Sequence, residues 1–278
     1  MFRMMLAFSL MVLLFGCAAT GKDASRKAQT GYESKDIATL EKMAEEGQAG
    51  AMYELGLRYK EGRGVPMETP RAADLFKQAA GQGLPEAMTE LADCYLDGRG
   101  VAANDRAAAK LYRTAAEKGQ ARAMTMLGRC YQHGWGLPQD YSEALKWYRR
   151  GAELSEVSAA YHVGAMHENG LGVPRDYAEA ARWYRKSGRL GNGSAMYRLG
   201  LLYDKGLGLP QDHAEAAQWY RKAADLHNAA AMNDLARLYE EGLGVPKDPD
   251  EALRLRLDAA RRGNEDAKET LNSRDIDW

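Results

Sequence analysis

Apolar and small residues recur along most of the chain with the spacing of a helix face. In the stretch from 195 to 203 they fall at i, i+1, i+4, i+5 and i+8, as Ala195, Met196, Leu199, Gly200 and Tyr203. Since an α-helix has 3.6 residues per turn, these positions share one side of a helix. The stretch is therefore predicted to be a helix that buries one face.

The same pattern returns every 36 residues. Alanine keeps this interval without insertion or deletion, at Ala51, Ala87, Ala123, Ala159, Ala195, Ala231 and Ala267. A second helical run follows each time and carries a Trp-Tyr pair or its equivalent, for example Trp183-Tyr184. Isolated helices of about 12 residues are marginal in water. Neighbouring units are thus expected to bury each other's apolar faces, as in repeat proteins.

Glycine, proline and an acid separate the two helices of each unit. In the stretch from 203 to 224, Gly206 can adopt the left-handed conformation of a helix end, and Pro210 prevents the helix from continuing. Asp212 and Glu215 then have the spacing of a capping box. The Gly-x-Gly could be taken for a phosphate-binding loop, but each acid caps the site that an anion would use. We expect a structural turn at all six copies.

The full pattern is A-x-x-x-L-G-x-x-Y-x-x-G-x-G-V-P-x-D-x-x-E-A-x-x-W-Y-x-x-A-A, and it resembles the Sel1-like repeat, a relative of the tetratricopeptide repeat. The resemblance covers six units, at about 47–82, 83–118, 119–154, 155–190, 191–226 and 227–262, with half-repeat caps at 36–46 and 263–278. It implies an all-α fold, an α/α solenoid wound as a right-handed superhelix. It also implies that a protein or peptide binds in the concave groove.

The N-terminal residues predict a lipoprotein signal peptide at 1–16. A basic residue, Arg3, precedes an apolar run from Met4 to Leu14, which is too short to span a bilayer. The run leads to Cys17, in a stretch that resembles a bacterial lipobox, so we expect Cys17 to be lipidated, with palmitate among its acyl chains. An ordinary signal peptide is the alternative. Ala18, by analogy with the family of lipoproteins, indicates the outer membrane.

Residues 17–35 follow as the lipidated cysteine and a polar segment without periodicity, which predicts a flexible tether. Its typical reach is about 24 Å. We expect the repeats at 36–278 to face the periplasm, with surface exposure left open, and the membrane to be contacted only through the N-terminal lipid.

Candidate partner-binding residues lie on the first helix of each unit, at positions that line the groove in the related repeat family. These positions vary between units while the core positions do not, as suits a surface fitted to a partner. The candidates are Tyr53, Arg129, Tyr161, Tyr197, Leu201 and Arg237, together with the loop residue Trp135. Tyrosine, tryptophan and arginine are typical of binding hot spots. The alternative is that these tyrosines cover their own stack and that Trp135 covers the local core.

The net charge, the histidine spacing and the cysteine positions narrow the range of possible functions. The formal net charge is −1 without a block of one sign, so we expect no nucleic acid partner. His162 and His167 are five residues apart, off the spacing of a helical metal pair, and we expect neither a metal nor another cofactor. Cys94 and Cys130 occupy equivalent positions of adjacent units, too far apart for a disulfide, so both are predicted to be buried thiols.

Three functions compete. The first is a non-catalytic interaction or scaffold module, expected to be a monomer. The second is a cell-wall or β-lactam hydrolase of the cysteine-rich Sel1 type, against which the chain has no Ser-x-x-Lys, Lys-Thr-Gly or Gly-x-Ser-x-Gly. The third is a structural role in an envelope assembly. We favour the first and expect no enzymatic activity.

Overall fold

The computed structural model describes residues 31–278. The predicted signal peptide, Cys17 and most of the tether lie outside the described residues. The chain forms two compact units, one ending at Gln120 and the other spanning Ala121–Trp278. They are called unit 1 and unit 2 below, and each is described by itself.

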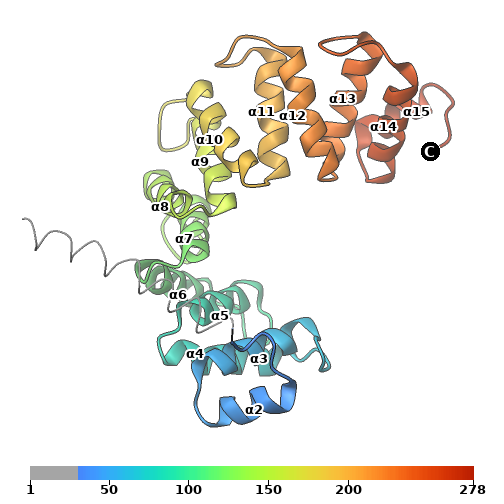
Figure 1. Cartoon of the computed structure of the whole chain (residues 1–278). Helices are drawn as coiled ribbons and strands as arrows, with labels where there is room; N and C mark the ends of the chain where they lie inside the picture. The colour runs from blue at the N-terminus through green and yellow to red at the C-terminus, as the bar shows by residue number, and fades with distance from the viewer. Residues whose placement is uncertain (1–30) are drawn as a thin grey trace, which may run out of the picture. The chain divides into compact units, whose positions relative to one another are not determined.

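Each repeat is a pair of antiparallel helices (Figure 1). The first helices are α3 (Ala49–Glu61), α5 (Pro85–Asp97), α7 (Ala121–His133), α9 (Val157–Asn169), α11 (Gly193–Lys205) and α13 (Ala229–Glu241). The second helices are α4 (Thr69–Gly81), α6 (Asp105–Glu117), α8 (Tyr141–Glu153), α10 (Tyr177–Arg189), α12 (His213–Asp225) and α14 (Pro249–Arg261). The described residues contain helices and no strand, so the predicted all-α repeat solenoid is confirmed.

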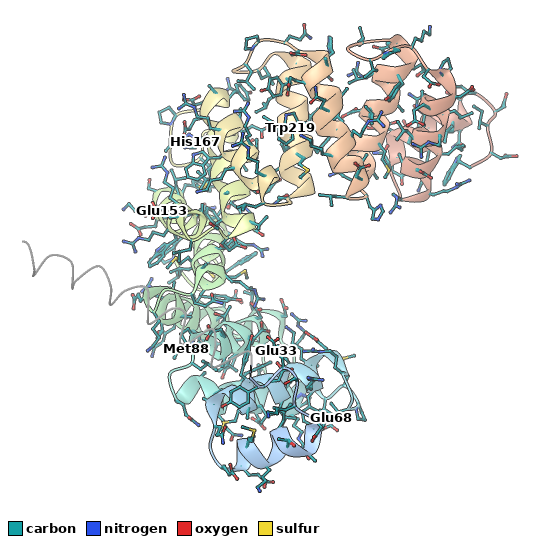
Figure 2. The ribbon with its side chains drawn as sticks, viewed as in Figure 1. Glu33, Glu68, Met88, Glu153, His167 and Trp219 are labelled. Carbon is teal, nitrogen blue, oxygen red and sulfur yellow. The ribbon has the colours of Figure 1, made fainter. Side chains whose placement is uncertain are left out.

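The predicted core positions are buried. All seven alanines of the 36-residue series have no exposed surface, and neither do the second-helix aromatics Phe76, Tyr112, Tyr148, Tyr184 and Tyr220. Glycine on the first helix allows this packing, because a Cβ on Gly200 would lie 2.6 Å from the ring of Tyr220. His167 and Trp219 are buried among the helices of unit 2 (Figure 2). Glycine at the first-helix position of Gly200 therefore has the predicted role, which is to let a neighbouring helix approach closely.

The turn between the two helices closes with one bond that recurs in every repeat. In the fifth repeat the backbone N–H of Asp212 donates to the carbonyl of Tyr203, at 3.0 Å. The Asp212 side chain accepts from the backbone N–H of Glu215 at 2.9 Å, as predicted. The reciprocal half of the capping box is not formed, because the N–H that Glu215 would accept from is already bonded to Tyr203.

In several repeats the second glycine of the Gly-x-Gly has a role that the sequence did not suggest. Gly208 has a φ of +67°, and a Cβ there would lie 2.4 Å from the backbone nitrogen of Ala178, near the start of α10 in the preceding repeat. Gly172 and Gly244 meet the preceding second helix in the same way. The backbone of the neighbouring repeat thus fills the space beside the loop, which agrees with a structural turn.

Half-repeats flank the six repeats. The first is α2 (Ile37–Glu45), which buries Leu40 and Ala44, and the last is α15 (Glu265–Asn272), which buries Ala267 and Leu271. The chain packs from residue 31 onward, earlier than the predicted end of the tether at 35. Tyr32 lies over Gly50 of α3, and its hydroxyl donates to Gln48 at 3.0 Å.

Candidate partner-binding face

Unit 1 contains one candidate residue, Tyr53 on α3. Its ring centre lies 6.1 Å from that of Phe76 on α4, at an angle of 50°. Tyr53 is half-buried, so one part of its ring covers the core of its own repeat and the other meets solvent. This position serves packing as well as an accessible surface.

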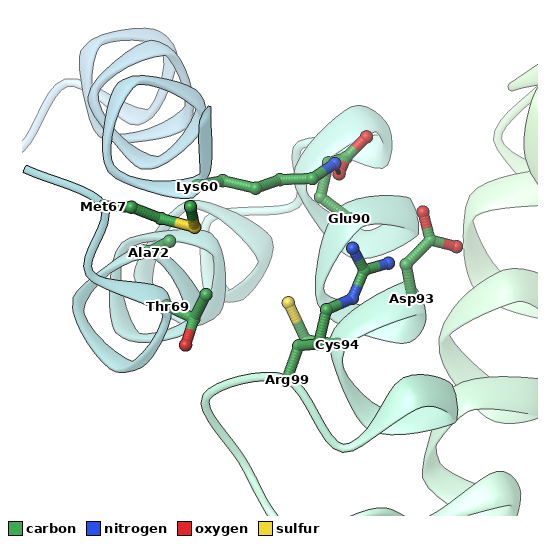
Figure 3. A pocket seen from close by; sticks show the side chains of 8 residues that line it. All are labelled: Lys60, Met67, Thr69, Ala72, Glu90, Asp93, Cys94 and Arg99. Atoms are coloured by element: carbon green, nitrogen blue, oxygen red, sulfur yellow. Dashed lines mark hydrogen bonds and ion pairs between the residues drawn. The ribbon is translucent and has the colours of Figure 1, made fainter. Parts of the chain in front are cut away.

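A pocket of about 80 Å³ lies nearby in unit 1, between the α3–α4 hairpin and α5 (Figure 3). Lys60 and Glu90 line it and form an ion pair at 2.6 Å, and Cys94 lies close to them. Burial, followed by the charge of Glu90, raises the pKa of the Cys94 thiol to about 11. The thiol is protonated at neutral pH, so this pocket does not supply a thiolate nucleophile.

In unit 2 the structure brings two predicted residues together. Arg129 on α7 places its guanidinium 5.2 Å from the centre of the Trp135 ring, a cation–π contact. The ring of His133 stacks on that of Trp135, with 4.7 Å between the ring centres. No carboxylate in the described part of the chain pairs with Arg129, whose other polar contact is the sulfur of Met126 at 3.6 Å.

The next helix of unit 2, α9, extends this aromatic group. His162 stacks on Tyr148 with 4.7 Å between ring centres, and Tyr161 lies edge-on to His162 at 5.5 Å. Burial, with a further contribution from the charge of Arg129, lowers the pKa of His162 to about 4. The imidazole is therefore neutral at physiological pH. Tyr161 also covers Tyr184 of its own repeat, at 5.7 Å.

Tyr197 on α11 repeats this arrangement one unit later. Its ring lies 5.9 Å from that of Tyr220, and burial followed by the charge of Asp234 raises the pKa of its phenol. Leu201, one helical turn further, is partly buried against the core of the last repeats. Both residues thus contribute to packing and keep an exposed part.

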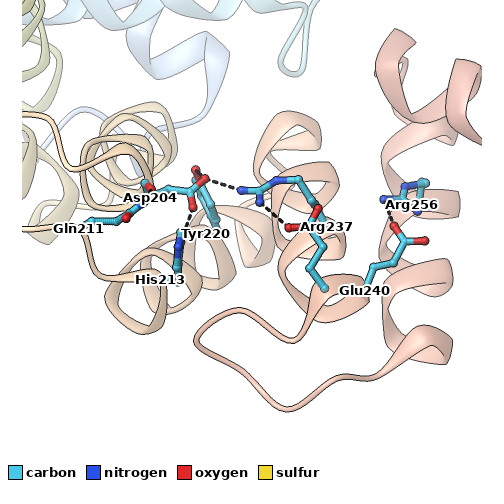
Figure 4. A network of polar contacts seen from close by, with 8 residues as sticks. Asp204, Gln211, His213, Tyr220, Arg237, Glu240 and Arg256 are labelled. Atoms are coloured by element: carbon cyan, nitrogen blue, oxygen red, sulfur yellow. Dashed lines mark hydrogen bonds and ion pairs between the residues drawn. The ribbon is translucent and has the colours of Figure 1, made fainter.

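Arg237 has a structural partner that the sequence did not reveal (Figure 4). It pairs with Asp204, whose side chain is 8% exposed and also accepts from His213 at 2.8 Å. The hydroxyl of Tyr220 donates to the same carboxylate at 3.3 Å. A charge held in this network links α13 to α11 and α12, so Arg237 is less available to a partner than Arg129.

The buried tyrosines of the second helices need a partner for their hydroxyls. Tyr148 donates to Gln132 at 2.7 Å, and Tyr184 and Tyr220 donate to residues at the equivalent position, Glu168 and Asp204. In the last repeat Arg256 replaces the tyrosine and pairs with Glu240, again at this position. We call these first-helix residues the hydroxyl-partner position. The 36-residue spacing contained the signal, since an acid or amide recurs there in the three successive repeats that bury Tyr148, Tyr184 and Tyr220.

Neither Cys94 nor Cys130 forms a disulfide, and both are buried, as predicted. Within residues 31–278 no group of three histidine, cysteine or acidic side chains is placed to hold a metal ion. None of the helices in that range has the length and hydrophobicity needed to cross a bilayer.

The fold and repeat geometry define an α/α solenoid of 36-residue helix pairs. Six matches to the Sel1 repeat occupy 49–84, 85–120, 121–156, 157–192, 193–228 and 229–264, and each match begins at the first residue of a first helix. The chain belongs to the Sel1 repeat family. Proteins of this family are generally protein–protein interaction modules and are generally non-catalytic.

Solved structures agree with this assignment, whereas no curated protein matches the chain. A protective antigen of uropathogenic Escherichia coli with an SLR fold is 36% identical, with a TM-score of 0.78 over 84% of this chain. The match covers 50% of the antigen, so this chain corresponds to half of it. A Sel1 repeat protein from Oxalobacter formigenes is 31% identical, with a TM-score of 0.75, and the match covers 89% of this chain and 98% of that one.

Proposed function

We propose that this chain is a protein-binding module that holds a peptide segment against the first helices of unit 2, centred on Arg129 and Trp135. The observation that carries the proposal is a half-buried arginine without a carboxylate partner, set against stacked aromatic rings. Arginine and tryptophan in such a setting are typical of interface hot spots. The face would therefore supply one charged anchor and an apolar surface around it.

The neighbouring helices of unit 2 explain why this part of the face is favoured. Glu168 and Arg198 neutralise each other between α9 and α11, at 3.5 Å, and Asp204 neutralises Arg237 between α11 and α13. One repeat earlier, between α7 and α9, the residues that correspond to Glu168 and Arg198 are Gln132 and His162, which are uncharged. Arg129 is thus left as a cation that an acidic group of the partner can pair with.

The partner chemistry follows from this arrangement. A peptide with an acidic side chain or a terminal carboxylate, next to an apolar residue, would match the guanidinium and the aromatic rings. Since Tyr161 and Tyr197 also cover their own repeats, they would add contact area on a rigid surface.

The experiment compares charge reversal at two exposed arginines. Arg129→Glu should reduce cross-linked capture of protein from envelope extracts at least tenfold, because it removes the cation and adds a repelling charge. Arg262→Glu makes the same charge change at an exposed position away from this face and should leave the captured set unchanged. Equal capture by both variants, with helicity verified by circular dichroism, would remove the proposal.

The envelope anchor is a separate part of the proposed function. The apolar run that precedes Cys17 supports attachment to the outer membrane through acyl chains. Metabolic labelling with an alkyne fatty acid should mark the wild-type chain and fail with Cys17→Ala. Labelling that persists in this variant would show that Cys17 is not the acylated residue.

A further inference from the structure

Three leucines at equivalent positions are exposed on unit 2. Leu154, Leu190 and Leu226 are 38%, 40% and 50% exposed, and each ends the second helix of its repeat. The equivalent residues of unit 1 are polar, Gln82 and Lys118. Gln82 uses its amide to donate to the carbonyl of Gly47 in the preceding turn, at 2.9 Å. A leucine side chain cannot form such a hydrogen bond, and exposed apolar groups in a row indicate a contact surface.

The leucines lie along one edge, where successive turns meet. Ser155, next to Leu154, lines an open depression together with Leu190 of the following repeat. Leu226 lies over the start of α11, since a Cβ on Gly193 would be 3.3 Å from the Cβ of Leu226. The three side chains therefore follow each other from repeat to repeat.

Cations surround this row. The depression, of about 470 Å³, is lined by four basic side chains of α10, namely Arg182, Arg185, Lys186 and Arg189. Arg182 pairs with Glu179 at 3.0 Å. Arg185 and Lys186 donate to uncharged oxygens, the hydroxyl of Tyr203 at 2.6 Å and the carbonyl of Ala152 at 2.8 Å. Among the described residues, no acid neutralises Arg185, Lys186 or Arg189.

The flanking second helices repeat this chemistry. Arg150 lies 4.8 Å from the centre of the Trp147 ring, and Lys222 lies 4.2 Å from that of Trp219. In α10 the ammonium of Lys186 lies 5.0 Å from the Trp183 ring. Each of the three repeats thus presents a leucine and, close to it, a cation over a tryptophan. We call this surface the leucine–cation edge.

We propose that the leucine–cation edge docks on an anionic phospholipid bilayer. The leucines would enter the boundary between headgroups and acyl chains, and the cations would meet lipid phosphates. The same residues recur at each repeat, which suits a partner that is itself uniform, whereas the candidate residues on the first helices differ between repeats. The docking needs neither the lipid at Cys17 nor the face around Arg129, so it goes beyond the proposed function.

A fluorophore placed on the edge tests the docking directly. In the full chain carrying Cys17→Ser, Leu190→Cys supplies an exposed thiol for an environment-sensitive dye, because Cys94 and Cys130 are buried. Vesicles of phosphatidylcholine with an equal part of phosphatidylglycerol should shift the emission to the blue, and vesicles of phosphatidylcholine alone should not. Dye at Met67→Cys, exposed in unit 1, should not respond. No shift, or an equal shift on both vesicles, overturns the proposal.

Neutralising pairs of cations tests whether vesicle binding depends on the leucine–cation edge or only on the net charge of the protein. A cation near an anionic surface raises affinity about fivefold, so Arg189→Gln with Lys222→Gln should weaken binding to the mixed vesicles about 25-fold. Lys77→Gln with Lys110→Gln removes the same charge from α4 and α6, where the leucines are missing, and should change binding less than twofold. Equal weakening by the two pairs overturns the proposal. Binding of the edge to an acidic protein but not to the mixed vesicles overturns it as well. Arg129→Glu should bind vesicles normally, which keeps this test independent of peptide capture.

Discussion

The two units build the same 36-residue frame with different polar chemistry. In the first repeat of unit 1 the second helix buries Phe76, which has no hydroxyl. Lys60, at the hydroxyl-partner position, donates instead to Glu90 of the next repeat. Unit 2 has tyrosine at the equivalent of Phe76 in three successive repeats, and an acid or amide accepts each hydroxyl. A buried hydroxyl without an acceptor is costly. The frame therefore tolerates changes at these positions when they occur in pairs.

Tyr112, the second aromatic of unit 1, tests this rule within the structure. The hydroxyl-partner position of its repeat is Leu96, which cannot accept a hydrogen bond. Asp93, less than one helical turn earlier, accepts the hydroxyl instead. The requirement is thus for an acceptor near the ring, and either of two first-helix positions can supply it.

The largest effect is expected from a comparison of two second glycines, Gly208 in unit 2 and Gly64 in the first turn of unit 1. Gly208→Ala should cost about 4 kcal/mol, since a left-handed backbone and a Cβ in contact with backbone are both unfavourable. Gly64→Ala, in unit 1, should cost about 1.5 kcal/mol, because its Cβ would meet only the side chain of Ile37, at 3.7 Å. Urea unfolding measures both, and equal losses would contradict the close approach of repeats.

The next effect concerns pH. At the position where unit 1 has Glu90, unit 2 has His162, whose folded pKa of about 4 lies below its usual 6.5. Since the folded state disfavours the proton, this stability is present above pH 6.5 and is lost as pH falls from 6.5 to 4. The loss is on the order of 3 kcal/mol. Thermal unfolding of His162→Gln should lose less stability over this range than wild type, and parallel pH curves would contradict the assignment.

A smaller effect is expected for the hydroxyl pair. Tyr148→Phe leaves the Gln132 amide without its donor and should cost about 1 kcal/mol. Adding Gln132→Leu makes both positions apolar, as neither group then needs a partner, and should recover most of this loss. A double variant less stable than the single one would show that Gln132 has another role in the fold.

The smallest difference is expected at the helix caps. Asp212 accepts a hydrogen bond from Glu215 at the start of α12, so Asp212→Ala should cost about 1 kcal/mol. Glu68 occupies the equivalent position of α4 without a capping bond from its side chain, and Glu68→Ala should be nearly neutral. Comparable losses in chemical denaturation would contradict this contrast.

The sequence predicted the features that repeat. The alanine series, the paired aromatics, the first glycine of each turn and the aspartate caps all follow from local propensity and a 36-residue period, and the structure confirms them. Of the candidate residues, the pair Arg129 and Trp135 comes together in space, whereas Arg237 is paired with the buried carboxylate of Asp204. Whether these residues bind a partner stays a prediction.

Contacts between repeats could not be predicted in the same way. The pairing of Arg237 with Asp204 joins residues 33 positions apart, and the second glycine meets the backbone of the preceding repeat. Only one of the two hydrogen bonds of the predicted capping box forms, because the N–H that the second bond would use already donates to a carbonyl of the first helix. These contacts depend on how far apart neighbouring helices lie, which a periodic pattern does not state.

The amino-acid order alone determined that this chain is a stack of helix pairs, because helix faces, turns and caps depend on residues close in sequence. The tertiary structure decided which polar groups pair between helices, which cation is left without an acid, and which leucines remain at an exposed edge. Those outcomes depend on distances across the stack, where a shift of a few ångströms makes or breaks a hydrogen bond.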